Sequence, residues 1–116
     1  MVGRSVRIRL LDILTAIEEA TEILDGADFA DYQNSLVTRR AVERCTEIIS
    51  EAVRHRPDEM TSRFAEIPWQ DIRSIGNRLR HDYQRVGDLV MWRTATRSPP
   101  DLRVVVARLI AEVDTP

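Results

Sequence analysis

The chain has 116 residues, of which 43% are hydrophobic and 31% are charged. This length suits one domain rather than two, and the apolar content is too high for a disordered tail. With 17 basic and 19 acidic residues, the formal net charge is -2, which argues against a chain that binds nucleic acid through overall positive charge.

Cysteine content and apolar run lengths exclude further classes. The single cysteine, Cys45, cannot form an intramolecular disulfide, and no Cys/His spacing typical of a zinc site is present. No apolar run approaches the roughly 18 residues that span a bilayer, and arginines interrupt the N-terminal segment. We therefore expect a cytoplasmic protein without membrane association.

Helical spacing dominates the chain. Apolar residues three and four apart predict helices over 6–24, 36–54, 68–87, 88–96 and 102–113. Asp25-Gly26 ends the first helix, the stretch 27–34 adds a helical turn, and Ser35 caps the second helix. We expect Asp58 to cap a short helix through Phe64 and Pro99-Pro100 to break the chain before the last helix. These elements predict a single domain over 1–116, an all-α antiparallel bundle of about five helices.

Local charge departs strongly from the total. Residues 1–31 carry 3 arginines against 7 acidic residues, whereas residues 73–97 carry 6 arginines against 2 aspartates. Every basic residue is arginine, whose guanidinium makes bidentate contacts with phosphate. Codon bias accounts for the absence of lysine, but it accounts less well for arginines clustered around one histidine.

The two histidines have different surroundings. His55 stands between two arginines before Pro57 and is interpreted as a solvated helix end. His81 lies in the sequence Gly-Asn-Arg-Leu-Arg-His-Asp-Tyr, and on a helix it shares a face with Asn77, near Arg73 and Arg80. Histidine can take and give protons near neutrality, and arginine can stabilise a developing phosphorane, so this grouping suits RNA cleavage without a metal. The alternative is a solvated polar stripe with no catalytic role.

Four segments carry a resemblance to a known family. They are Arg9-Leu10-Leu11-Asp12-Ile13-Leu14 with Ala16-Ile17, Ala41-Val42-Glu43-Arg44 with Glu47 to Ala52, Ile67-Pro68-Trp69-Gln70-Asp71-Ile72, and Asn77-Arg78-Leu79-Arg80-His81-Asp82-Tyr83. In this order they resemble the HepT-like branch of the HEPN superfamily, small helical ribonuclease toxins encoded beside a minimal nucleotidyltransferase antitoxin. The resemblance covers most of the chain.

The resemblance implies a homodimer whose two His-x-Tyr segments face a shared cleft that cleaves RNA without a metal or cofactor. His81 then matches the general base or acid, and Asn77 matches the polar residue four positions earlier. Tyr83 matches the hydroxyl to which the antitoxin of a type VII-like toxin-antitoxin system transfers AMP, which silences the cleft. By its spacing alone, Tyr83 equally suits a place in the core.

Gly76 departs from the family pattern, which places an arginine directly before the asparagine. We expect Arg78 or Arg73 to replace it in catalysis, with Arg80 and Arg85 binding RNA. Glycine also leaves room for an arginine from farther away in the chain or from the other protomer. Higher activity of a Gly76→Arg variant would support the view that the missing arginine weakens catalysis. Glu51 is either a buried partner of an arginine on the 68–87 helix or a surface residue.

The sequence also bears on three other functions. The main alternative is a catalytically degenerate bundle that binds a nucleotidyltransferase or RNA, because position 76 is glycine where the family pattern has arginine. A nucleotidyltransferase is disfavoured because no Gly-Ser motif with paired carboxylates is present, and no glycine-rich phosphate loop appears. No helix-turn-helix spacing stands out, so DNA is not an expected partner.

Overall fold

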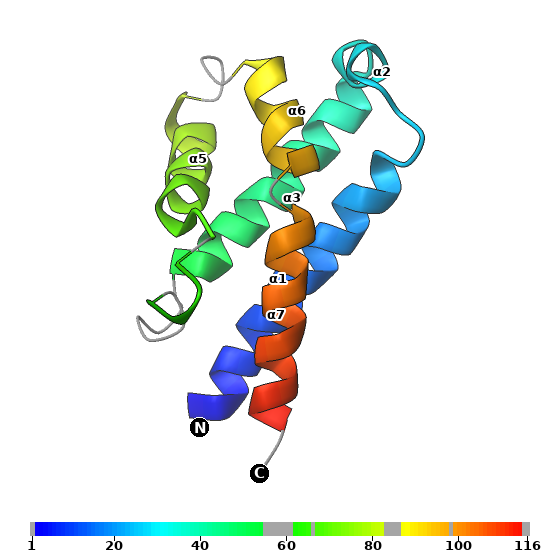
Figure 1. Cartoon of the computed structure of the whole chain (residues 1–116). Helices are drawn as coiled ribbons and strands as arrows, with labels where there is room; N and C mark the ends of the chain where they lie inside the picture. Colours follow the sequence, from blue (N-terminus) through cyan, green and yellow to red (C-terminus); the bar gives the residue numbers. More distant parts are fainter. Residues whose placement is uncertain (1, 55–61, 66, 83–86, 98, 115–116) are drawn as a thin grey trace.

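A computed structural model describes residues 2–54, 62–65, 67–82, 87–97 and 99–114. Over these ranges the chain is helical and contains no strand, which confirms the all-α fold (Figure 1). The helices are α1 (Val2–Ile23), α2 (Phe29–Gln33), α3 (Leu36–Arg54), α5 (Trp69–Asp82), α6 (Asp88–Arg97) and α7 (Pro99–Asp114). Two expected features lie outside the described residues: the Asp58 cap, and the continuation of α5 through residues 83–86.

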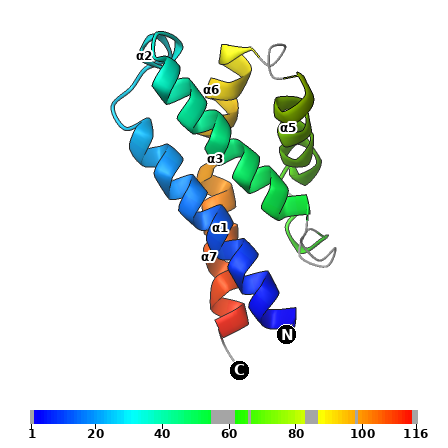
Figure 2. The ribbon, with the colours of Figure 1, turned by 180° about the vertical axis from the view of Figure 1, so that it is seen from behind.

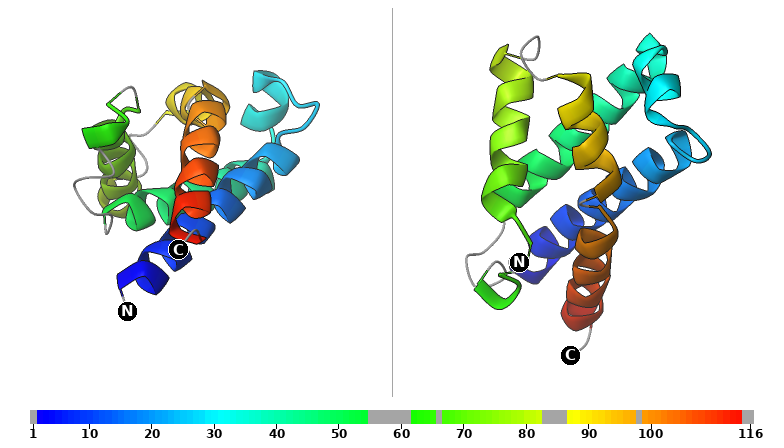
Figure 3. Two further views of the ribbon diagram at one scale, coloured as in Figure 1. Left: turned by 60° about the horizontal axis from the view of Figure 1, so that its bottom comes forward. Right: turned by 45° about the horizontal axis from the view of Figure 1, so that its top comes forward.

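Helix α3 is central to the bundle. It packs against α1 on one side and against α5 on the other, while α7 packs along α1 (Figure 2). Helix α6 contacts α3 and leads into α7, which runs down to the end of the molecule where α1 begins (Figure 3). The Arg7 guanidinium joins these two ends, with its Nε 2.7 Å from the Asp114 carboxylate.

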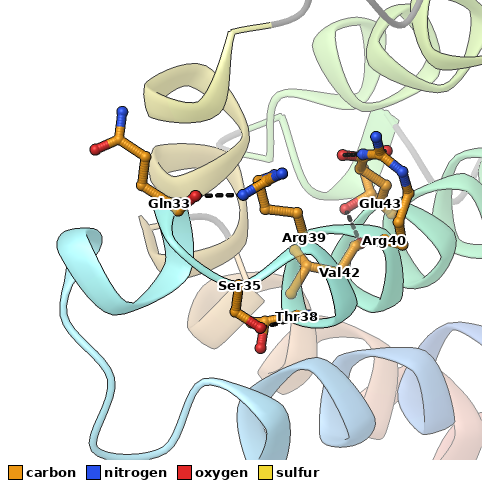
Figure 4. A network of polar contacts seen from close by, with 8 residues as sticks. Gln33, Ser35, Thr38, Arg39, Arg40, Val42 and Glu43 are labelled. Atoms are coloured by element: carbon orange, nitrogen blue, oxygen red, sulfur yellow. Dashed lines mark hydrogen bonds and ion pairs between the residues drawn. The ribbon is translucent and has the colours of Figure 1, made fainter.

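Turn chemistry sets the corner between α1 and α3 as predicted. Gly26 has φ +75°, a left-handed conformation that glycine adopts without strain, and it follows the end of α1. A capping box between Asp28 and Asp31 starts α2. The Ser35 hydroxyl accepts from the Thr38 backbone N–H at 3.2 Å, which confirms the expected cap of α3. Figure 4 shows this corner, where the Arg39 guanidinium also donates to the Gln33 carbonyl.

Two boundaries differ from the sequence prediction. Helix α1 starts at Val2 rather than near residue 6, and α7 starts at Pro99 rather than at Leu102. The two prolines therefore lie in the first turn of a helix instead of forming a break. A first turn tolerates proline because the N–H groups at this position have no partner within the helix.

The core has two apolar clusters. The larger one joins α1, α3 and α7, with contributions from α5, Phe64 and Ile67. The smaller one surrounds Tyr32 and includes Val42, Leu79 and Met91, and the Trp92 ring packs against the Tyr32 ring in a tilted arrangement with centroids 5.7 Å apart. The Tyr32 hydroxyl is buried without a hydrogen-bond partner, and burial raises the pKa of this phenol to about 12. Burial also raises the pKa of the Cys45 thiol.

In the part of the chain that the structure describes, no helix combines the length and apolarity needed to cross a membrane.

Candidate active site

Helix α5 carries the residues singled out in the sequence, and Trp69 fixes where it starts. The Trp69 indole N–H donates to the Phe64 carbonyl at 3.0 Å, and the Pro68 carbonyl accepts the N–H of Ile72 at 3.1 Å. Trp69 is therefore an anchor that holds the first turn of α5 against the preceding segment. The Ile-Pro-Trp motif positions the site rather than contributing reactive groups to it.

Helices α3 and α5 meet at Ser50 and Gly76, and both residues are buried. The Ser50 hydroxyl donates to the Arg73 carbonyl at 3.1 Å. A Cβ atom on residue 76 would approach both Oγ and Cβ of Ser50 to less than 3.0 Å, closer than real side chains come. Gly76 is thus required for the close approach of the two helices.

This contact corrects the expectation that glycine leaves spare room at position 76. The Ser50 side chain already occupies the space that the Cβ atom of a larger residue at position 76 would need. Any larger residue there, arginine included, has to push α5 away from α3. Gly76→Arg would therefore disturb the packing of α3 on α5, whatever effect its charge has on activity.

A basic hollow runs along the exposed face of α5. Its lining comprises Arg54 of α3 and Gln70, Arg73, Ser74, Asn77, Arg78 and Arg80 of α5. Four of these seven residues are arginines and none is acidic, so the hollow attracts anions. The structure brings together the predicted residues Arg73, Asn77, Arg78 and Arg80.

Arg54 is a lining residue that the sequence analysis missed. It lies in the last turn of α3, one turn beyond Ser50, so it faces α5 for the same helical reason. The signal that would have identified it is the burial of Ser50. Serine carries no apolar signal of its own, so the apolar pattern of α3 does not show that Ser50 lies in the contact with α5.

His81 lies in the last turn of α5 and is exposed. It does not line the hollow, but its spacing of four from Asn77 places it on the same helical face, one turn further along. An exposed imidazole next to a basic groove is accessible to a bound polyanion. Tyr83 and Arg85 lie outside the described residues, so their roles stay predictions.

Glu51 connects the two helices at the edge of the hollow. One oxygen of its carboxylate lies 3.2 Å from Nη1 of Arg54 and 3.7 Å from Nη1 of Arg80. The Glu51 side chain is 50% exposed. It is therefore a partner of an α5 arginine, as one alternative predicted, without being buried.

Among the described residues, no three His, Cys, Asp or Glu side chains gather in a group that could hold a metal ion.

Comparison with known proteins relates this geometry to a family. A family profile described as Ribonuclease HepT-like matches residues 13–109. The probable ribonuclease HepT of Thermococcus cleftensis is 34% identical over 100 residues, covering 86% of this chain and 91% of that protein. A candidate RNase of Caldanaerobacter subterraneus subsp. tengcongensis is 31% identical over 107 residues, covering 92% and 96%. A candidate RNase of Methanocaldococcus jannaschii is 26% identical over 114 residues, covering 98% of each chain. No solved structure matches the chain.

Proposed function

Because this chain belongs to the ribonuclease HepT-like family, we propose that it is a metal-independent endoribonuclease that cleaves RNA along the exposed face of α5. The observation that carries this proposal is the hollow with four arginines and no acidic residue, next to Asn77 and His81 on one helix. An RNA backbone carries one negative charge per nucleotide, and guanidinium groups bind phosphate through paired N–H donors.

The proposed reaction uses the ribose 2′-hydroxyl as the nucleophile. His81 takes the 2′-hydroxyl proton as the oxygen bonds to phosphorus. The P–O5′ bond breaks, and the 5′ oxygen takes a proton from solvent. The products are a 2′,3′-cyclic phosphate and a 5′-hydroxyl. Asn77 orients the phosphate through its amide N–H, and the arginines stabilise the negative charge that develops in the transition state.

The active species that we propose is a homodimer with one cleft between the two α5 helices. Support comes from the exposure of Asn77, Arg78 and His81, which leaves the reactive face open on one side. A second protomer would cover this face and exclude water around the phosphate, which strengthens electrostatic contacts. Sedimentation of the purified chain tests this point directly.

We also propose that the protein is a toxin whose nucleotidyltransferase antitoxin silences it by transferring AMP to Tyr83. The support is the family together with the position of Tyr83 two residues after His81. An AMP group there would add a phosphate beside the basic face and compete with RNA for it. Intact-mass measurement after coexpression with the antitoxin, for wild type and Tyr83→Phe, tests the transfer.

The alternative is a bundle that binds RNA or the antitoxin without cutting. The absence of an arginine at position 76 favours it.

The deciding experiment is cleavage of a labelled RNA in EDTA by the purified chain, with His81→Ala and His55→Ala prepared identically. The proposal expects wild type and His55→Ala to produce a cyclic phosphate end and His81→Ala to produce none. Equal cutting by all three would indicate a contaminating RNase. No cutting by folded, dimeric wild type with unmodified Tyr83 would leave the binding function.

A further inference from the structure

A single carboxylate holds two arginines where α3 and α5 meet. Glu51 lies 3.2 Å from Nη1 of Arg54 on its own helix and 3.7 Å from Nη1 of Arg80 on the other helix. Both arginines line the basic hollow. Two positive charges and one negative charge leave this group of three residues, the Glu51 clamp, with a net charge of +1.

The Glu51 carboxylate lies within ion-pair distance of both arginines before any ligand arrives. Among the described residues, no acidic side chain pairs with Arg73 or Arg78, which line the same hollow. Arg80 is also the least exposed member of the clamp, with 30% of its side chain exposed against 46% for Arg54. A donor that is already positioned loses less conformational freedom when charge develops in front of it.

The position of Arg80 is a consequence of the glycine at 76. Nη1 of Arg80 lies 3.5 Å from the point that a Cβ on residue 76 would occupy. Arg80 follows Gly76 by one helical turn, so its side chain leans back over the earlier turn, as long side chains on helices do. The Arg80 guanidinium therefore lies next to Gly76, which has no side chain.

Arginine retains unused donors in such an arrangement. A guanidinium has five N–H groups, and the contact with Glu51 involves one nitrogen of each arginine. The remaining donors can take a phosphate oxygen without breaking the clamp.

From these observations we infer that the Glu51 clamp binds the scissile phosphate of RNA, with Arg80 as the arginine that stabilises the transition state, Arg54 as a binding residue and Glu51 as a positioning residue. The inference rests on the proposed ribonuclease function. It replaces the expectation that Arg78 or Arg73 fills this role and gives Arg80 more than an RNA-binding role.

The test compares kcat and KM for RNA cleavage by wild type, Arg80→Ala, Arg80→Lys, Arg54→Ala, Arg78→Ala and Glu51→Gln. We expect Arg80→Ala to lower kcat by about 100- to 1000-fold with little change in KM, as for other positioned donors. Arg80→Lys should recover only part of this, because an ammonium lacks the fork. Arg54→Ala should raise KM by about 10-fold, as for a lost charged hydrogen bond.

Glu51→Gln keeps the shape of the side chain and removes its charge, so it separates positioning from folding. We expect kcat to fall by up to about 100-fold while the thermal midpoint stays near that of wild type. Arg103→Ala is the matched control, because it also breaks an exposed ion pair, with Glu18 at 3.4 Å, and its residue is absent from the hollow. Its kcat and KM should equal those of wild type.

Binding of a fully 2′-O-methylated RNA, which lacks the nucleophile, gives a second measurement that is independent of cleavage. If wild type cleaves RNA but Arg80→Ala matches it in kcat while Arg78→Ala does not, the inference fails and the proposed function stands. If wild type does not cleave, the proposed function fails, and the phosphate site is judged by binding alone. Equal affinity of wild type and Arg54→Ala for the methylated RNA would then overturn it as well.

Discussion

The contact between Ser50 and Gly76 makes Gly76→Ala a sensitive test of the packing of α3 on α5. A single methyl group added at position 76 would meet both Oγ and Cβ of Ser50 at less than 3.0 Å. A Cβ atom has no rotamer to change, so the clash can be relieved only by movement of Ser50 or of the helix backbones. If the Ser50 hydroxyl turns away, it gives up its hydrogen bond to the Arg73 carbonyl.

The expected magnitude follows from three contributions. Overpacking by a methyl group in a packed interior costs about 1–3 kcal/mol. Loss of the Ser50 hydrogen bond costs about 1 kcal/mol, and the higher helix propensity of alanine over glycine returns about the same amount. The free energy of unfolding should therefore fall by about 2 kcal/mol. In a domain of this size that corresponds to a thermal midpoint lower by about 8 °C.

The assay is urea and thermal unfolding followed by circular dichroism, with two reference variants. Gly87→Ala is the matched glycine control, because a Cβ there has no neighbour within 4 Å, and its cost should stay within about 1 kcal/mol. Ser50→Gly removes both clashing atoms, so adding Gly76→Ala to it should cost nothing or stabilise. This corresponds to a coupling energy of about 2 kcal/mol between the two positions. Additive effects of the two substitutions, or a Gly76→Ala variant as stable as wild type, would show that the helices do not meet at this point.

Four further outcomes are expected from the same structure. The pKa of the buried Tyr32 phenol is about 12, whereas unfolded tyrosine titrates near 10. The free energy of unfolding should therefore fall as the pH rises from 10 to 12, because the unfolded chain loses the phenol proton first. In urea unfolding, Tyr32→Phe should lose less free energy of unfolding than wild type over this pH range. Tyr32→Phe should also be at least as stable as wild type at pH 7, since it removes a buried hydroxyl without a partner. The Cys45 thiol, buried and with a raised pKa, should react with a thiol reagent only at the rate of unfolding, and fast labelling of the native protein would contradict its burial. Arg73→Ala should lower the slope of log Kd for RNA against log salt concentration by roughly 1, because one phosphate contact is lost. An unchanged slope would show that the RNA backbone does not bind in the hollow.

Local sequence signals predicted most of the fold correctly, and the departures have local causes. Gly26 ends α1, Ser35 caps α3 and Asp88 begins α6, as predicted, because each effect involves neighbours within four positions. The pair Pro99-Pro100 predicts a break, because proline in the interior of a helix disrupts it. Proline in the first turn can instead begin a helix, as it does here. The sequence does not distinguish the two cases until the register of the following helix is known.

The candidate site was only partly predictable because it is formed by two helices distant in the chain. Asn77, Arg73 and Arg80 follow from spacing on one helix, and the hollow contains all three. Arg54 and the role of Glu51 depend on how α3 lies against α5, which the Ser50 and Gly76 contact determines. Two small residues 26 positions apart carry no periodic signal, so the contact was not visible in the sequence.

The same contact links the stability of the bundle to its chemistry. A glycine at 76 lets α5 lie close enough to α3 for Glu51 to reach Arg80 across the helices. An arginine at 76 would supply a guanidinium directly, but it would move α5 outward and separate Glu51 from Arg80. Loss of the arginine at 76 and gain of the clamp are therefore two effects of one close helix approach. It follows that Gly76→Arg should lower both the thermal midpoint and kcat, whereas a simple deficit of charge at position 76 would raise kcat.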